Sequence, residues 1–418
     1  MWSDMSIPRS AVDRIAPTPW RAEDNPARPL VTPATPKILL YSHDTFGLGN
    51  IRRSILLGEL FTAEYPRAAV LLVTGSPMIH AFRIPDRMDY VKLPCLNRVS
   101  AEQYAPRFLV DCADEVRRTR SEIIEHTAIG FQPDIFIVDK RAAGIEGELV
   151  PALEALRRLA RPPRVVLGLR DILDAPARTR QALRTNGSFE IIERYYDEVW
   201  IYGSRGIFDA VAEYDFPPGV GARTRYCGYL RRRALPRPPR TGTPRVLVTT
   251  GGGADGDALI RSYLAGLAGV PPGELTSLVI LGPQLDLASA EALRALAAGR
   301  PDVTFIDFEA DLTRRYAEAD VVVSMAGYNT VCELLTANAT AVLVPRAEPV
   351  EEQLIRARCL ASRRLFSMVE PSELTPDRLM GAVRAALAST PAAVSPIDME
   401  GLMRIRTRVD RLLDRSGA

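Results

Sequence analysis

The sequence lacks the features that mark several large classes of protein. Its five cysteines are widely scattered and include no C-x-x-C pair, so they indicate neither a disulfide framework nor a zinc site. No apolar run reaches the roughly 18 residues of a membrane span, and the first residues lack the apolar core of a secretion signal. Lysine plus arginine (53) nearly balance aspartate plus glutamate (51), so the net charge of +2 gives no field for nucleic acid. The composition favours a small-molecule substrate in a reducing cytoplasm and leaves peripheral contact with a membrane open.

The length of the chain and the distribution of its prolines indicate a tail, two domains and a linker. A sequence of 418 residues is long enough for two domains with separate cores. Residues 1–36 hold seven prolines among small and charged residues, which predicts an extended tail without a core. Short β-rich runs alternate with helical patterns over 37–230 and again over 245–395. The basic segment 231–244, with four prolines, is typical of an interdomain linker.

The β-rich runs are almost continuously hydrophobic, as in Ala69–Thr74 and Ile135–Asp139. Such runs indicate parallel strands that are covered by helices on both faces of a sheet. The predicted fold class is therefore α/β, with two doubly wound domains that face each other across a cleft. In sheets of this kind, ligands bind beyond the carboxyl ends of the strands, so the loops that follow the strands are where the chemistry is expected.

The most informative of these loops follows the run that ends at Ser324. A glycine turn at Gly327 and the start of a helix come next, with Glu333 one turn inside that helix. A helix N-terminus offers unpaired N–H groups and a positive dipole end to a diphosphate, and the carboxylate of Glu333 could accept the hydroxyls of a ribose. The alternative is a purely structural capping box, since Thr330 and Glu333 also form T-x-x-E.

Two further loops in the second half suit the same ligand. The run Thr249-Thr-Gly-Gly-Gly-Ala-Asp255 follows a strand directly, so its backbone N–H groups could line the phosphate side of the cleft, although a tight turn explains it equally well. Glu352 and Gln353 begin a helix and could bind sugar hydroxyls. Acidic residues in a first helical turn are also what the helix dipole favours.

In the first half, Ser42-His-Asp-Thr-Phe-Gly-Leu-Gly-Asn50 follows the first strand. Its two glycines permit a tight turn, and His43 and Asp44 are expected to point into the cleft. His43 is one of only three histidines, and histidine is the side chain that best exchanges protons near neutral pH. A simple strand-to-helix turn is the alternative, in which Arg52 and Arg53 form a solvated helix face.

Taken together, these motifs resemble those of glycosyltransferases with the GT-B fold. The second half is similar to the donor domain of the UDP-N-acetylglucosamine transferase of bacterial peptidoglycan synthesis, through G-G-G, S-M-A-G-Y-N-T-x-x-E and E-E-Q-L-I-R-A. Residues 37–390 resemble more closely a bacterial family of predicted glycosyltransferases. That resemblance rests on Y-S-H-D-T-F-G-L-G-x-x-R-R, P-D-I-F-I-V-D-K, L-G-L-R-D-I-L-D and Y-Y-D-E-V-W-I-Y-G.

The resemblance implies a role for each matching position. Glu333 would hold the ribose, and Arg346 would be a neighbouring cation. The diphosphate would lie against Gly252, Gly253, Gly327, Asn329 and Thr330, and the donor sugar against Glu352 and Gln353. The acceptor side would comprise Gly47, Gly49, Arg53, Asp139, Arg170 and Asp171. Residues 396–418 would return as a helix to pack on the first domain.

The resemblance also implies the chemistry. A hexosyl or N-acetylhexosaminyl group would pass, with inversion, from a UDP- or dTDP-linked donor to a small-molecule or lipid-linked acceptor. The enzyme would need neither a metal nor a cofactor beyond the nucleotide sugar, because the helix dipole, backbone amides and basic side chains would stabilise the leaving diphosphate.

One position departs from the family pattern. Asn50 stands where the family has a histidine after G-L-G, and an amide cannot take a proton near neutral pH. His43 or Asp44 would then be the general base, or the acceptor would need less help, or transfer would be lost. Two alternatives to transfer stay open: a nucleotide-sugar epimerase on the same fold, and a non-catalytic protein that binds nucleotide sugars.

Overall fold

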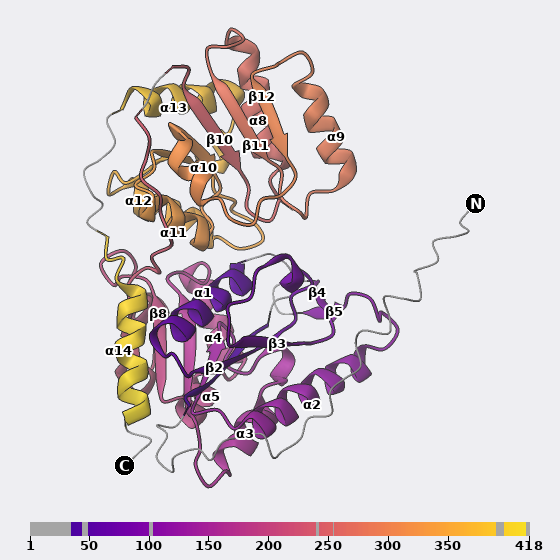
Figure 1. Cartoon of the computed structure of the whole chain (residues 1–418), viewed down its shortest axis with the longest axis vertical. Helices are drawn as coiled ribbons and strands as arrows, with labels where there is room; N and C mark the ends of the chain where they lie inside the picture. The colour runs from indigo at the N-terminus through magenta and orange to yellow at the C-terminus, as the bar shows by residue number, and fades with distance from the viewer. Residues whose placement is uncertain are drawn as a thin grey trace, which may run out of the picture. The chain divides into compact units, whose positions relative to one another are not determined.

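A computed structural model describes residues 35–43, 49–99, 103–239, 242–253, 255–389 and 397–414. The predicted tail lies almost entirely outside these residues. Residues 36–418 group together as one compact unit. Within that unit, two parallel sheets follow each other along the chain (Figure 1).

The first sheet has seven strands in the order β3-β2-β1-β6-β7-β8-β9, all parallel. Its strands are β1 (Lys37–Ser42), β2 (Ala69–Thr74), β3 (Met88–Lys92), β6 (Ile135–Asp139), β7 (Arg164–Arg170), β8 (Glu198–Tyr202) and β9 (Thr224–Tyr226). The helices of this half are α1 (Gly49–Glu64), α2 (Ala113–Phe131), α3 (Val150–Arg157), α4 (Pro176–Thr185), α5 (Ser188–Tyr195), α6 (Ala210–Glu213) and α7 (Pro218–Arg223), with 3₁₀ turns η3 (Ile79–Ala81) and η4 (Ile145–Gly147). A separate antiparallel hairpin joins β4 (Leu96–Arg98) to β5 (Tyr104–Pro106).

The second sheet has six parallel strands in the order β12-β11-β10-β13-β14-β15. The strands are β10 (Arg245–Thr249), β11 (Thr276–Ile280), β12 (Val303–Ile306), β13 (Val321–Ser324), β14 (Ala341–Leu343) and β15 (Ser367–Met368). The helices are α8 (Asp257–Gly266), α9 (Leu287–Leu296), α10 (Thr313–Glu318), α11 (Tyr328–Thr336), α12 (Glu352–Ala361) and α13 (Pro376–Ala388), with 3₁₀ turns η5 (Leu267–Gly269) and η6 (Pro371–Glu373).

The hydrophobic pattern explains why the central strands form as they do. Every residue of β6, β8 and β13 is buried, because helices cover both faces of each sheet. The α/β fold class predicted from the sequence is therefore confirmed. In the first sheet the strand order reverses between the neighbouring strands β1 and β6. In the second sheet it reverses between β10 and β13. The carboxyl ends on either side of such a reversal are where ligands bind in open α/β sheets.

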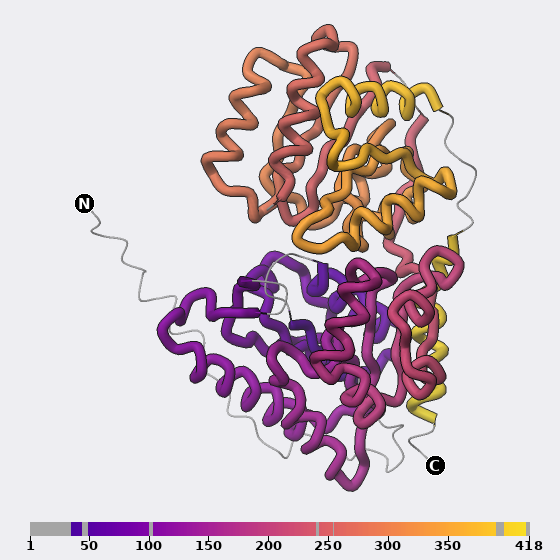
Figure 2. Tube along the Cα trace, turned by 180° about the vertical axis from the view of Figure 1, so that it is seen from behind, coloured from indigo at the N-terminus to yellow at the C-terminus, as the bar shows by residue number. Residues whose placement is uncertain are grey.

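The last helix, α14 (Gly401–Asp414), lies against α1 of the first half (Figures 1 and 2). Its buried side chains Ile405, Val409 and Leu412 follow helical spacing and join the core that contains α1. The hydroxyl of Tyr65, the residue directly after α1, donates a hydrogen bond to the carboxylate of Asp410 on α14, at 2.7 Å. The chain therefore returns to its N-terminal half after it has built the second sheet.

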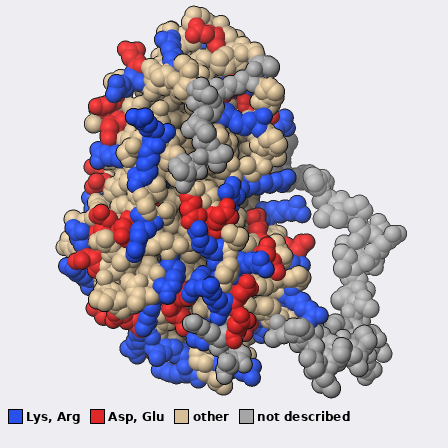
Figure 3. Space-filling model, turned by 90° about the vertical axis from the view of Figure 1, so that its left-hand side faces the viewer, with Lys and Arg blue, Asp and Glu red and all other residues tan. Residues whose placement is uncertain are grey.

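One face of the molecule carries charges of both signs. On the face in Figure 3, acidic and basic side chains are interspersed, in keeping with the net charge of +2. Among the described residues, no helix is both long and apolar enough to cross a membrane.

Candidate functional site

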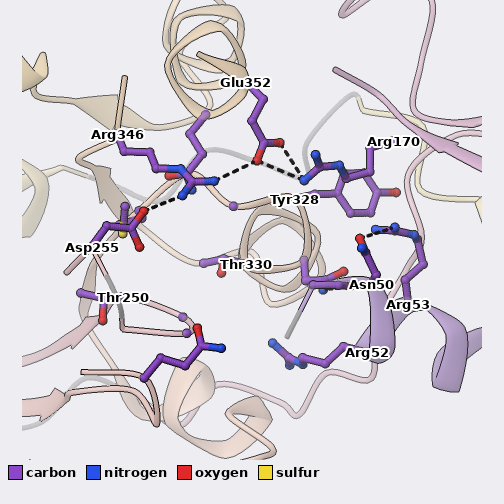
Figure 4. A pocket seen from close by; sticks show the side chains of 18 of the residues that line it. Asn50, Arg52, Arg53, Arg170, Thr250, Asp255, Tyr328, Thr330, Arg346 and Glu352 are labelled. Atoms are coloured by element: carbon purple, nitrogen blue, oxygen red, sulfur yellow. Dashed lines mark hydrogen bonds and ion pairs between the residues drawn. The ribbon is translucent and has the colours of Figure 1, made fainter. Parts of the chain in front are cut away.

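A pocket of about 770 Å³ lies where the loops after the strands of both sheets meet. Twelve of the residues singled out in the sequence line it: His43, Gly49, Asn50, Arg53, Arg170, Gly252, Gly327, Asn329, Thr330, Arg346, Glu352 and Gln353. Side chains from both halves point toward its open middle (Figure 4). Asp44 and Gly47, which were also expected here, lie outside the described residues.

The N-terminus of α11 opens on this pocket. Gly327 is the residue that precedes the helix, and no side chain caps it. The first amides of a helix have no partner within the helix, so those of Tyr328, Asn329 and Thr330 are available to a ligand. All four residues line the pocket. The geometry therefore offers an oxyanion both hydrogen-bond donors and the positive end of the helix dipole.

Glu333 has partners that the sequence did not reveal. Its carboxylate forms an ion pair with Arg52 of α1 and accepts a hydrogen bond from the hydroxyl of Tyr316 at 3.2 Å. The capping-box alternative is wrong, because Gly327 rather than Thr330 precedes the helix and Glu333 turns toward Arg52. Arg52 and Tyr316 line the pocket, whereas Glu333 itself lies behind them and is only 8% exposed.

Two glycines of the loop after β10 differ in position: one lines the pocket and the other supports the loop. Gly252 lines the pocket, and its carbonyl accepts a hydrogen bond from the backbone N–H of Gln284 at 2.9 Å. Gly253 does not line the pocket and has a φ of +95°. A Cβ on Gly253 would lie 2.5 Å from the carbonyl oxygen of Leu281, so this position needs glycine for the close approach of two loops.

Glu352, at the start of α12, is surrounded by arginines. Its carboxylate lies 3.0 Å from Arg170, 3.1 Å from Arg356 and 3.7 Å from Arg346. Burial alone would raise the pKa of Glu352, but these cations lower it to about 2. Figure 4 shows the contacts of Glu352 with Arg170 and Arg346, and the contact of Arg346 with Asp255 at 2.6 Å. The carboxylate of Glu352 is thus a fixed negative charge at neutral pH.

Gln353 differs from its neighbour. It is 8% exposed, and its Oε1 atom is buried without a hydrogen-bond partner in the described part of the chain. Buried polar atoms are nearly always hydrogen-bonded, so an unpaired oxygen beside a pocket indicates a place for a ligand donor such as a sugar hydroxyl.

Asp171 has a structural position rather than a place in the pocket. Its carboxylate is 2% exposed and accepts from the guanidinium of Arg356 at 2.7 and 2.9 Å and from the hydroxyl of Tyr229 at 2.9 Å. Arg356 in turn donates to the carbonyl of Ala326, just before α11, at 2.8 Å. This buried pair joins the end of β7 to the turn that presents the helix N-terminus.

On the side of the pocket that the first half of the chain builds, Arg53 contacts two of the other expected residues. It is 1% exposed, so a solvated helix face is the wrong interpretation, and it forms a bidentate pair with Asp139 at 2.6 Å. Arg53 also donates to Oδ1 of Asn50 at 2.9 Å. Because Arg53 fixes the amide of Asn50, the Nδ2 group of Asn50 faces Nε2 of His43, at 3.3 Å.

His43 is buried, and its pKa is well below the usual value because of burial and the nearby charges of Lys140, Arg141 and Arg53. The ring is therefore neutral at pH 7. With Asn50 as the donor, its Nε2 lone pair is occupied by the amide instead of facing the open pocket.

Several pocket residues were not singled out in the sequence. Lys140 directly follows Asp139 at the end of β6, so the rule that ligands lie beyond strand ends could have identified it. Arg98 ends β4 and Arg107 directly follows β5, and no hydrophobic pattern indicates this hairpin. Tyr316 and Arg52 become relevant only through Glu333, which is far away in the sequence.

Fold and site together define a class. Two doubly wound parallel sheets with a pocket at their carboxyl ends are the architecture of GT-B proteins, and solved structures of that class superpose on the chain. One is the MurG of Acinetobacter baumannii, with a TM-score of 0.53 at 16% identity over 91% of this chain and 100% of that one. Another is CalG4, the calicheamicin glycosyltransferase, with 0.54 at 17% identity over 92% and 95%. A protein of Listeria monocytogenes assigned provisionally to UDP-N-acetylglucosamine 2-epimerases gives 0.59 at 11% identity over 92% and 98%, so the shared fold does not separate transfer from epimerisation.

A family model matches the second half of the chain. Residues 246–406 match the glycosyltransferase family 28 C-terminal domain. One relative is the UDP-N-acetylglucosamine–N-acetylmuramyl-(pentapeptide) pyrophosphoryl-undecaprenol N-acetylglucosamine transferase of Corynebacterium efficiens. The two sequences are 32% identical over 141 residues, and this aligned region covers 34% of this chain and 36% of that protein. The chain is 35% identical over 196 residues to the enzyme of that name from Halorhodospira halophila, 41% of this chain and 49% of the relative.

The chain thus spans between a third and a half of the length of these curated relatives. The comparisons confirm the predicted resemblance to GT-B glycosyltransferases, and they locate its sequence signal in the half that carries α11 and α12.

Proposed function

We propose that the protein is a glycosyltransferase that moves a sugar, with inversion and without a metal, from a nucleotide-diphosphate donor to a hydroxyl or amine acceptor. The observation that carries the proposal is the uncapped N-terminus of α11 at the pocket, with Glu333 on the same helix. This helix lies inside the region that matches the glycosyltransferase family 28 C-terminal domain.

The donor's diphosphate would lie against the first amides of α11 and the backbone of Gly252. Negative charge that develops on the leaving diphosphate would meet the helix dipole and the guanidinium of Arg346. The ribose would reach Glu333 once Arg52 has turned aside. Arg52 lines the same pocket, so a nucleotide would compete with it for Glu333.

The donor sugar would bind at the start of α12. The unpaired Oε1 of Gln353 can accept a hydrogen bond from a sugar hydroxyl, whereas the Glu352 carboxylate is held in place by three arginines. We assign direct sugar contact to Gln353, and a share in it to Glu352 only where one of the arginines on its two oxygens turns aside.

The acceptor oxygen or nitrogen would attack the anomeric carbon from the N-terminal side. His43 is neutral and can take the proton if Nε2 breaks its contact with Asn50, or Asp44 can take it from the same loop. A non-catalytic nucleotide-sugar-binding protein is the second candidate. The observation that favours it is the Asn50 amide, which contacts Nε2 of the neighbouring His43 and stands where the sequence resemblance implies a histidine.

The proposed partners are a UDP- or dTDP-linked sugar and a small-molecule or lipid-linked acceptor, with the enzyme in the cytoplasm or at the inner face of a membrane. No nucleic acid partner is proposed, because the charge of the chain is nearly balanced.

Incubation with UDP- and dTDP-linked sugars labelled in the sugar tests the proposal. Transfer predicts free nucleotide diphosphate that appears only when an acceptor extract is added, with the label passing to a new product. Isomerised donor would establish an epimerase, and saturable binding without turnover would establish the binding protein. If neither UDP nor dTDP shifts the melting temperature at millimolar concentration, the nucleotide-diphosphate site is wrong.

A further inference from the structure

The two ends of the Asn50 amide have different partners in the pocket. The side-chain oxygen, Oδ1, accepts a hydrogen bond from the guanidinium of Arg53 at 2.9 Å (Figure 4). The side-chain nitrogen, Nδ2, lies 3.3 Å from Nε2 of His43. Because an arginine donates hydrogen bonds and cannot accept them, only the oxygen of the amide can face Arg53. The NH₂ group of Asn50 is therefore turned toward the histidine ring.

Arg53 is held from several sides, so it fixes the amide firmly. It is 1% exposed and donates to both carboxylate oxygens of Asp139 at 2.6 Å. Its guanidinium carbon lies 5.9 Å from the ring centroid of Tyr202 and 5.8 Å from that of Tyr328. Bidentate pairing and contact with aromatic rings both restrict the plane of a guanidinium. The orientation of the Asn50 amide thus depends on a buried pair that joins the end of β6 to α1.

The contact with Asn50 requires a lone pair on the ring of His43. Nε2 faces an N–H group, so the hydrogen bond forms only when Nε2 carries no proton. Burial is the main cause that holds the pKa of His43 well below its usual value, which favours the neutral ring. A neutral imidazole carries one proton, which is then on Nδ1.

The surroundings of Nδ1 agree with a proton at that atom. Nδ1 is buried, and no residue in the described part of the chain gives it a well-aligned hydrogen bond. The backbone carbonyl of Asp139 nevertheless acts on the ring and raises the pKa of His43, as an acceptor near a ring N–H does. A carbonyl can only accept, so it favours a protonated nitrogen on its side of the ring.

We propose that Asn50 is a positioning residue for His43, and that it selects the ring tautomer with the proton on Nδ1 and the lone pair on Nε2. Asp139 and Arg53 act one step further away, because they orient the amide of Asn50. The tautomer follows from the contacts of these four residues. Its use in transfer rests on the function proposed above.

This tautomer is the one that a general base at Nε2 needs. His43 and Asn50 both line the pocket, so an acceptor O–H or N–H can replace the amide at Nε2 and meet the lone pair directly. The acceptor atom would bond to the anomeric carbon while the bond from that carbon to the diphosphate oxygen breaks. The acceptor's proton would pass to Nε2, and the electron pair of the broken bond would leave with the nucleotide diphosphate. Asparagine at position 50 would then support proton transfer instead of marking its loss.

Nuclear magnetic resonance of protein labelled with ¹⁵N-histidine tests the tautomer at pH 8. The chain has three histidines, and the exposed His80 and His126 are assigned by changing each to glutamine, which leaves the signals of His43. Nε2 is recognised because it couples strongly to both carbon-bound ring protons. We expect the wild type to show a protonated Nδ1 and an unprotonated Nε2. A proton on Nε2, in a neutral or a cationic ring, would overturn the proposal.

Asn50→Asp should reverse the tautomer. A carboxylate only accepts hydrogen bonds, so the ring atom that faces it must carry a proton, and Nε2 becomes the protonated nitrogen. Asn186→Asp is the matched control, because Asn186 is exposed and its Oδ1 accepts from the backbone N–H of Ser188, a contact that aspartate keeps. A melting curve confirms that each variant is folded. An Nε2 that stays unprotonated in folded Asn50→Asp would contradict the selection of the tautomer by Asn50.

Turnover separates this proposal from the proposed function. In an active enzyme, Asn50→Asp should lower turnover at pH 8 by roughly 100-fold, because the proton on Nε2 removes the base. Wild-type protein with the expected tautomer but without transfer keeps the positioning role of Asn50 and loses the proposed function. Full turnover in Asn50→Asp with a reversed tautomer would overturn the use of this tautomer in transfer.

Discussion

Arg52, the fourth residue of α1, forms an ion pair with Glu333 of α11, which lies 281 positions further along the chain. Two other contacts accompany it. Asn329 donates to the carbonyl of Gly49 at 2.8 Å, and Arg232 reaches both the carbonyl of Arg52 and the side chain of Asn329, at 3.3 and 2.9 Å. The carboxylate proposed to hold the ribose is thus neutralised by the opposite wall of the pocket, and a nucleotide must compete with Arg52 for it.

Replacing Glu333 with glutamine should weaken UDP binding by about 1–3 kcal/mol, the usual range for a hydrogen bond to a charged group. The amide keeps the shape of the side chain but loses the charge that favours ribose hydroxyls. Calorimetric titration with UDP measures the effect, and Glu373→Gln in η6 is the control because its side chain is 54% exposed. Equal UDP affinity in the two variants would show that Glu333 only anchors Arg52.

Replacing Arg52 with alanine should lower the stability of the ligand-free protein and increase the stabilisation that UDP gives. The Glu333 carboxylate, 9% exposed, would lose its counter-ion, so we expect the ligand-free protein to lose about 1–3 kcal/mol of unfolding free energy. UDP should then stabilise the variant more than it stabilises the wild type, since the ribose no longer displaces a guanidinium. Melting curves with and without UDP give both quantities, and a smaller UDP-induced shift in the variant would speak against competition.

His43→Ala should lower turnover by roughly 100-fold and leave UDP affinity unchanged, if His43 takes the acceptor's proton. The reactive form is the neutral ring, and the pKa of His43 lies below its ordinary value of about 6.5. Wild-type turnover should therefore stay level from pH 9 down past pH 6.5 and fall only at a more acidic pH, where the ring gains a proton. A rate that falls between pH 9 and 7, or full activity in His43→Ala, would exclude this residue as the base.

Asn50→His tests the same step from the other side. The new imidazole would stand where the sequence resemblance implies a histidine, beside Arg53 and His43. We expect a gain in turnover if the wild type is limited by proton transfer. No gain beside an active wild type would show that the proton already leaves by another group on the loop.

Breaking the buried pair of Asp171 and Arg356 should lower the free energy of unfolding rather than act directly on the reaction. Asp171→Ala leaves a fully buried guanidinium without its main partner, and such losses typically amount to about 3–5 kcal/mol. Arg358→Ala, which breaks an exposed pair with Glu370, should cost less than about 1 kcal/mol. Denaturant unfolding compares the two, and similar costs would contradict the structural role given to Asp171.

The sequence predicted those parts of the fold that depend on residues close together in the chain. The central strands are long hydrophobic runs, and the rule that ligands lie beyond parallel strand ends then located Gly327, Asn50 and Gln353 correctly at the pocket. Two edge strands were missed, because Met88–Lys92 has only its first residue buried and Ser367–Met368 is only two residues long. Neither has a continuous apolar run to mark it.

The rest of the site depends on partners that are distant in sequence. Asp139 and Asp171 were expected on the acceptor side, yet buried arginines hold both of them, across 86 and 185 positions. Arg52 looked like a surface residue until its partner on α11 was placed. A single sequence carries no signal for such pairings, since each depends on how the two sheets come together.

A crystal structure with UDP tests the central claim most directly. We predict that the phosphates lie against the backbone amides of Asn329 and Thr330 at the start of α11, with the ribose hydroxyls on Glu333 and Arg52 displaced from it. UDP bound away from the N-terminus of α11, or a pocket that stays empty at millimolar UDP with the Arg52–Glu333 pair intact, would contradict the account.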